Sequence, residues 1–171
     1  MTTPMRTFLR APAILALCAA ICAPVAAAAD VVRPAPNFGI DGVAKGTSLR
    51  SFHGQSVVLV ITKSARVKEF RRELARLKQM YSQFSNEKVI FVAAIENGPA
   101  EVRSDIPFVT AANPAQVAAD YGVTDRFAIA VIGVDGNLDM ITGKVINAAR
   151  VRDIIFNNFE SQQAARKPTG G

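Results

Sequence analysis

Two short apolar runs separated by one long amphipathic segment constrain the fold of this chain most strongly. Val57–Thr62 (VVLVIT) and Lys88–Ile95 (KVIFVAAI) are rich in β-branched and apolar residues, which is typical of strands buried on both faces. Between them, Ala65–Ser85 repeats apolar residues at steps of three and four, which predicts a helix with one apolar face. Strands that alternate with helices in this way predict an α/β domain.

Further strands and helices are predicted on both sides of this unit. Asp41-Gly42 and Asp135-Gly136-Asn137 are turn sequences that predict two hairpins, and Asn113-Pro114 predicts the start of a helix. The other expected elements are hairpin arms at 38–40 and 47–49, a short helix ending at Arg103, a strand at 106–110, a helix over 113–121 ended by Gly122, strands at 127–134 and 138–146, and an amphipathic helix over 150–159. This order predicts a mixed β-sheet flanked by helices, with an N-terminal hairpin.

The N-terminal residues have the pattern of a secretory signal peptide. Arg6 and Arg10 precede the apolar, alanine-rich stretch Ala11–Ala29, which ends in small residues. Cys18 and Cys22 are the two cysteines of the chain, and both lie in this stretch. Cleavage near residue 29 would therefore leave a mature protein without thiols or disulfides. The expected location is the periplasm or the exterior, with no stable membrane span after cleavage.

The expected organisation is one domain behind the signal peptide. We assign residues 1–29 to the signal peptide, 30–36 to a proline-rich entry segment, 37–159 to the domain and 160–171 to a disordered polar tail. The chain has 20 Lys and Arg and 14 Asp and Glu, and the signal peptide holds two of the arginines, so the mature chain carries about four net positive charges. These charges are spread along the sequence with little aromatic surface, which argues against nucleic acid as a partner.

Several short motifs in the same order resemble the thioredoxin-like fold, in particular its exported thiol-specific antioxidant and disulfide-reductase (AhpC/TSA-like) branch. These motifs are Pro36-Asn37-Phe38, the stretch 49–55 (LRSFHGQ), the strand Val57–Val60, Tyr121-Gly122-Val123 and Val134-Asp135-Gly136. The resemblance covers roughly residues 34–159. It implies a thioredoxin-like mixed sheet flanked by helices.

The redox residues of that family are missing at the positions where the resemblance places them. The family's tryptophan falls on Arg66, its two cysteines on Val67 and Phe70, and its cis-proline on Phe127. Thiol–disulfide exchange needs an attacking thiolate and a second thiol that resolves the mixed disulfide. Because Val67 and Phe70 continue the apolar stripe of the helix, we expect the former active site to have become core, and we assign no catalytic residue.

Basic residues gather where the long helix is expected to start. A candidate binding patch consists of Lys63, Ser64, Arg66, Lys68, Arg71 and Arg126. Helix starts favour anions through their free N–H groups and the helix dipole, so an anion or an acidic partner is one interpretation. The alternative, which the scattered charges favour, is a solvated face without a ligand.

Other polar residues give weaker indications of chemistry. His53 is the one histidine of the chain, and without cysteine or a second histidine a metal site is not expected. Glu69 and Glu73 lie four residues apart and have arginine neighbours, which predicts ion pairs on the helix surface rather than acid–base catalysis. The Asp135-Gly136-Asn137 sequence lacks the further acids of a calcium loop. No cofactor is expected.

Three functions remain open from the sequence. The first is a non-catalytic thioredoxin-like domain that binds a protein or peptide in the periplasm. The second is an antioxidant or thiol–disulfide oxidoreductase, which requires that the signal peptide with Cys18 and Cys22 is retained. The third is a module that binds an anion or small ligand at the helix start. The sequence favours the first and does not identify the partner.

Overall fold

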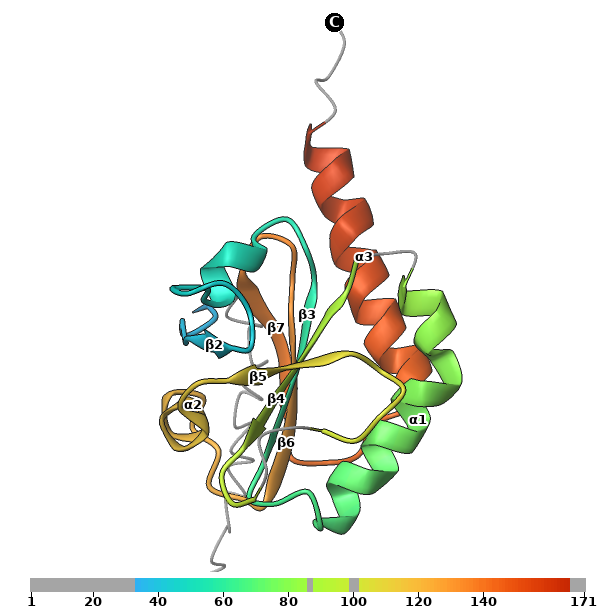
Figure 1. The fold of residues 1–171 in the computed structure, drawn as a ribbon. Coiled ribbons are helices and arrows are strands. Elements are labelled where there is room, and N and C mark those ends of the chain that lie inside the picture. Colours follow the sequence, from blue (N-terminus) through green and yellow to red (C-terminus); the bar gives the residue numbers. More distant parts are fainter. Residues whose placement is uncertain (1–32, 86–87, 99–101, 167–171) are drawn as a thin grey trace, which may run out of the picture. The chain divides into compact units, whose positions relative to one another are not determined.

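A seven-stranded mixed sheet runs through the described part of the protein, residues 33–85, 88–98 and 102–166 of a computed structural model (Figure 1). The strands are β1 (Arg33–Pro34), β2 (Ile40–Asp41), β3 (Val57–Thr62), β4 (Ile90–Ile95), β5 (Phe108–Ala111), β6 (Phe127–Ile132) and β7 (Asn137–Thr142). The helices are α1 (Lys68–Ser85), α2 (Pro114–Asp120) and α3 (Ala148–Arg166), with a 3-10 helix at Leu49–Phe52.

Strand β3 lies at the centre of the sheet, in the order β1-β7-β6-β3-β4-β5-β2. It pairs in parallel with β4, from Val57 opposite Ile90 to the ends of both strands. On its other side it pairs antiparallel with β6, where Thr62 lies opposite Phe127. All six β3 residues are buried, because the sheet is covered on both faces. The predicted parallel strands and mixed sheet are thus confirmed.

Alternate residues of β3 contribute to two separate apolar cores. Leu59 packs into a core that includes Val117 of α2, whereas Val60 packs into one that includes Leu77 of α1 and Val151 of α3. Figure 1 shows the corresponding arrangement, with α1 and α3 together on one face and α2 on the other. We call these the α1 face and the α2 face of the sheet.

The α1 face also contains a chain of aromatic rings. Phe91 of β4 makes edge-to-face contacts with Tyr81, Phe84 and Phe108, with ring centroids 5.7 to 5.9 Å apart. Such contacts stabilise aromatic pairs beyond the area that they bury. They fix the C-terminal half of α1 on the sheet.

The N-terminal hairpin is shorter than predicted. Its arms do pair, because Ile40 N–H donates to the Thr47 carbonyl and Leu49 N–H to the Phe38 carbonyl, both at 2.9 Å. Only Ile40–Asp41 forms a strand, however, and it pairs with β5 at the sheet edge. Leu49 starts the 3-10 helix, so the second arm ends there.

Helix α1 starts at Lys68, three residues later than predicted. The Ser64 hydroxyl accepts the Arg66 N–H at 3.2 Å and the Ser64 carbonyl accepts the Val67 N–H at 3.1 Å, so residues 64–67 form a separate turn. The bond from Arg71 N–H to the Val67 carbonyl, 3.2 Å long, belongs to the first true helical turn. Ser64 therefore caps the turn that precedes the helix.

The last strand and the last helix also differ from their predicted bounds. Strand β7 ends at Thr142, whose hydroxyl accepts the Lys144 N–H at 3.2 Å and turns the chain. The Asn147 side chain then accepts the Ala149 N–H at 3.0 Å, so α3 begins at Ala148 rather than Arg150. The helix continues to Arg166, past the predicted end at residue 159 and into the predicted tail.

Some predictions fall on residues that are not described. These are the signal peptide at residues 1–29, residues 30–32 of the entry segment, the end of the tail at 167–171, and most of the short helix expected before Arg103. The two described residues of that last segment, Val102 and Arg103, are not helical. None of the helices within 33–85, 88–98 and 102–166 combines the length and apolarity needed to cross a membrane.

Candidate binding site at the start of helix α1

The end of β3 brings Lys63 next to Arg126, so the part of the predicted binding patch before α1 lies beside Arg126, as the motif order suggested. The Arg126 carbonyl accepts the Lys63 N–H at 3.0 Å. The hydroxyl of Thr62, a buried residue, lies 3.1 Å from the carbonyl oxygens of both Arg126 and Ser64. These bonds tie the turn before α1 to the residue before β6.

The six patch residues differ in what they can offer a ligand. The Lys63 ammonium lies 2.6 and 2.7 Å from the two carboxylate oxygens of Glu96, so its charge is compensated within the protein. The Ser64 hydroxyl is engaged by the Arg66 N–H. Arg66, Lys68, Arg71 and Arg126 are exposed and remain as the cationic surface.

Acidic residues share this surface with Arg126. A polar hollow of about 180 Å³ is lined by Arg126, Glu69 and Asp125, together with Phe127 and Gly143. An anion entering this hollow would face two carboxylates beside one guanidinium. The cationic surface is therefore concentrated on Arg66, in the turn before α1, and on Lys68 and Arg71 in the first turn of the helix.

The positions that the resemblance gives to redox residues lie together in one apolar cluster. Phe70 and Phe127 are buried, with 3% and 2% of their surface exposed, and Val67 packs half-buried against the same cluster. The cluster also contains Val60 of the central strand and Val151 of α3. Apolar side chains in such a cluster stabilise the fold and offer no nucleophile.

Glu73 lies in the interior of the domain and not on the helix surface, where the sequence predicted it. It is fully buried, with 0% of its surface exposed, and forms none of the expected surface ion pairs within the described residues. Its Oε2 accepts the Ile146 N–H at 2.9 Å, whereas Oε1 has no hydrogen-bond partner in the described structure. The carboxyl group thereby ties α1 to the segment between β7 and α3.

Burial also changes the acidity of Glu73. Desolvation raises the pKa of its carboxyl group from 4.5 to about 7, although the Ile146 bond and the charge of Arg76 oppose this effect. The sequence did hold a sign of this position. Glu73 follows Phe70 by three residues and precedes Leu77 by four, so it falls on the apolar stripe of the helix. Its arginine neighbours, however, favoured a position on the helix surface.

His53 lies at the opposite end of β3, in the loop before the strand. It is exposed and lines a hollow of about 450 Å³ together with Arg50, Asp135 and apolar residues such as Phe52. Asp135 is occupied in the hairpin turn, where its carboxylate accepts the Asn137 N–H at 3.0 Å. In the part of the chain that the structure describes, no three acidic, histidine or cysteine side chains are grouped so that they could hold a metal ion.

Similarity to known proteins is found at the level of structure. No family model matches the chain, and no curated protein matches its sequence. Among solved structures, a candidate protein disulfide isomerase from Bacteroides thetaiotaomicron has a TM-score of 0.60 at 19% identity, covering 79% of this chain and 96% of that one. A candidate thiol:disulfide interchange protein DsbE from Chlorobium tepidum has a TM-score of 0.55 at 20% identity, over 78% and 95% of the two chains.

A peroxidase structure is similar to the same extent. Thioredoxin peroxidase I from Plasmodium yoelii has a TM-score of 0.55 at 16% identity, over 82% of this chain and 94% of that one. Together with the mixed sheet and its flanking helices, these similarities establish a thioredoxin-like fold. The expected fold class is thereby confirmed.

Proposed function

We propose that this chain is a non-catalytic thioredoxin-like module of the periplasm that binds a protein or peptide partner. The observation that carries the proposal is the burial of Phe70, with half-buried Val67 beside it, at the positions that the resemblance assigns to the redox cysteines. The sequence contains no cysteine after Cys22. A thiol mechanism would therefore require the N-terminal segment to remain attached.

The turn before α1 and the first turn of the helix form the surface that we propose for the partner. Arg66, Lys68 and Arg71 are exposed there and form no ion pair within the described residues. Charges arranged in this way favour a partner with an acidic surface, both in the rate of association and in specificity. The compensation of Lys63 by Glu96 weakens the alternative of a small inorganic anion at this turn.

Co-purification from a periplasmic extract tests the partner. The wild-type protein is expected to enrich a defined partner that the variant Arg66→Glu/Lys68→Glu does not retain. A matched control, Lys45→Glu/Arg50→Glu, makes the same charge change at exposed positions in the segment before β3 and should retain it. Equal enrichment by all three proteins would exclude this surface as the docking site.

Intact mass spectrometry of the protein from its native envelope tests the proposed export and the absence of thiols. The expected mass corresponds to a chain that starts near residue 30 and contains no cysteine. A mass that includes residues 1–29 would contradict the proposal and reopen the thiol-dependent alternative.

A further inference from the structure

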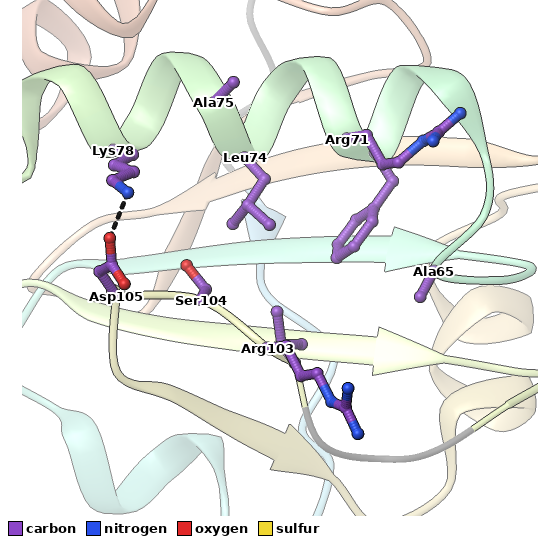
Figure 2. A pocket seen from close by; sticks show the side chains of 10 residues that line it. Ala65, Arg71, Leu74, Ala75, Lys78, Arg103, Ser104 and Asp105 are labelled. Atoms are coloured by element: carbon purple, nitrogen blue, oxygen red, sulfur yellow. Dashed lines mark ion pairs between the residues drawn. The ribbon is translucent and has the colours of Figure 1, made fainter.

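Basic residues cover the outer side of α1 over about three turns. Figure 2 places Ala75 on this side, where it points away from the facing segment 102–105. Residues spaced by four share one face of a helix. Two such rows of exposed residues form what we call the outer strip of α1: Lys68, Arg72 and Arg76, and Arg71, Ala75 and Gln79. The outer strip thus contains four cations and no acid.

The two acidic residues of α1 do not compensate the charge of the outer strip. Glu73 is fully buried, and Glu69 is half-buried and lines the same polar hollow as Asp125. Neither glutamate forms an ion pair with a basic residue of the helix in the part of the chain that the structure describes. The helix therefore turns its acids inward and presents an outer surface of one charge.

The stability of the helix does not account for this arrangement. Lys68 and Arg72 are like-charged residues four apart, as are Arg72 and Arg76, and such pairs destabilise a helix. Lys68 and Arg71 also lie in the first turn, where the helix dipole disfavours cations, whereas the last turn has no basic residue. Charges that break local rules without a gain in stability are typical of functional surfaces. The outer strip therefore points to a partner of opposite charge.

We propose that the outer strip of α1 binds an extended acidic segment of the protein partner. This inference rests on the proposed function, and it extends the docking surface along the helix to Arg72 and Arg76. Residues four apart rise by about 6 Å along a helix, and every second residue of an extended chain rises by about 7 Å. An acid at every second position of the segment can therefore lie beside one cation of the strip, and guanidinium groups match carboxylates well.

The surroundings of the outer strip favour a narrow partner over a broad anionic surface. Asp105 lies beside α1 in its ion pair with Lys78 (Figure 2). Glu69 and Asp125 line the hollow near the start of the helix. A membrane with anionic lipids would also approach these carboxylates, whereas a single extended chain on the strip avoids them. Among the described residues Val43 is the one exposed large apolar side chain, so the strip has no apolar anchor and its binding depends on charge.

Fluorescence anisotropy with a labelled heptapeptide that alternates Glu and Ser tests the proposal. The protein is expected to bind this peptide, more weakly as the NaCl concentration rises, and not to bind a peptide with Gln in place of Glu. The variant Arg72→Gln/Arg76→Gln should bind the acidic peptide about fivefold more weakly. The control Lys45→Gln/Arg50→Gln removes the same charge from exposed positions before β3 and should stay within about twofold of wild type.

Stability and a second variant separate this inference from the proposed function. In urea denaturation at pH 6, below the pKa of Glu73, the variant Arg72→Gln/Arg76→Gln should be at least as stable as wild type, because it removes like-charged pairs. Peptide binding that is weakened only by Arg66→Gln/Lys68→Gln would confine docking to the start of α1 and overturn this inference, while the proposed function would stand. A clear loss of stability in Arg72→Gln/Arg76→Gln, or binding of phosphatidylglycerol vesicles without binding of the acidic peptide, would also overturn it.

Discussion

Among the described residues, each of the two faces of the sheet buries one ionisable side chain, and the two side chains differ in their hydrogen bonding. On the α2 face, the Tyr121 hydroxyl donates a hydrogen bond of 3.0 Å to the Pro36 carbonyl. On the α1 face, one carboxyl oxygen of Glu73 accepts the Ile146 N–H, and the other has no partner among the residues that the structure describes. A buried polar group costs little stability when it is hydrogen-bonded and much more when it is not.

The same burial has different consequences for the two groups at neutral pH. Desolvation raises the pKa of Tyr121 further above its usual value, so the phenol stays neutral. Desolvation raises the pKa of Glu73 to about 7, so its protonation changes within the physiological range. The comparison teaches that burial makes the α1 face, and not the α2 face, respond to pH near neutrality.

The largest expected effect comes from the buried ring of Phe70, three residues before Glu73 in α1. Phe70→Ala should lower the free energy of unfolding by about 3–5 kcal/mol, because it leaves a cavity in the α1 face. Urea denaturation measures this loss. Arg72→Ala, an exposed change two residues along the same helix, is the control and should cost less than about 0.5 kcal/mol. A similar small cost for Phe70→Ala would mean that the ring contributes little to the core.

Introducing two cysteines tests whether Val67 and Phe70 are needed for the packing of the α1 face. Val67→Cys/Phe70→Cys should destabilise the domain by about 3 kcal/mol, because a thiol replaces only part of the lost ring. We also expect little reduction of insulin by this variant, since Arg66 and Phe127 occupy the positions where the resemblance places a tryptophan and a cis-proline. A double variant that is as stable as wild type and reduces insulin efficiently would contradict the interpretation of this region as core.

Titration of Glu73 should make stability depend on pH. Its folded pKa of about 7 exceeds the ordinary 4.5, so the folded state holds the proton more tightly than the unfolded state. The stabilising effect of this proton is complete below pH 4.5, declines as the pH rises to 7, and is lost above it. Unfolding free energies measured from pH 4.5 to 8 should fall by up to about 3 kcal/mol from this group.

Glu73→Gln is the matched variant for this effect. The amide keeps an oxygen that can accept the Ile146 N–H but does not titrate in this range. The difference between the two stability curves should therefore vary with pH, and the glutamine curve should be flatter. Parallel curves would show that another group carries the dependence.

The smallest effect is expected on the α2 face. Tyr121→Phe removes the bond to the Pro36 carbonyl and should cost about 1 kcal/mol. Because the phenol is neutral throughout this range, the cost should be the same at pH 5 and pH 8. A cost that changes between these two pH values would contradict the proposed contrast between the faces.

The sequence predicted the fold well because the strongest local patterns coincide with the centre of the sheet. The apolar run at Val57–Thr62 and the helix after it leave few arrangements other than a buried strand with a crossover. Element ends were less predictable. Residues 160–166 were assigned to a disordered tail because they are polar, although their glutamines and alanines are good helix formers.

The candidate site was only partly predictable from the sequence. Arg126 was correctly placed beside the start of α1, because the order of motifs brings the residue before β6 next to the end of β3. The pairing of Lys63 with Glu96 depends on a partner 33 residues away, which no local pattern indicates. Glu73 was misplaced because its charged neighbours suggested a surface position more strongly than its spacing suggested the core.

The central position of β3 also has a consequence for how this chain folds. Val57 pairs with Ile132, 75 residues later, whereas its parallel partner Ile90 follows after 33 residues. Pairings over long sequence separations close large loops and slow the folding of a domain. Until β6 has joined, one whole edge of this apolar central strand stays open to other chains. Conditions that delay this late step should therefore promote aggregation rather than a stable half-folded form.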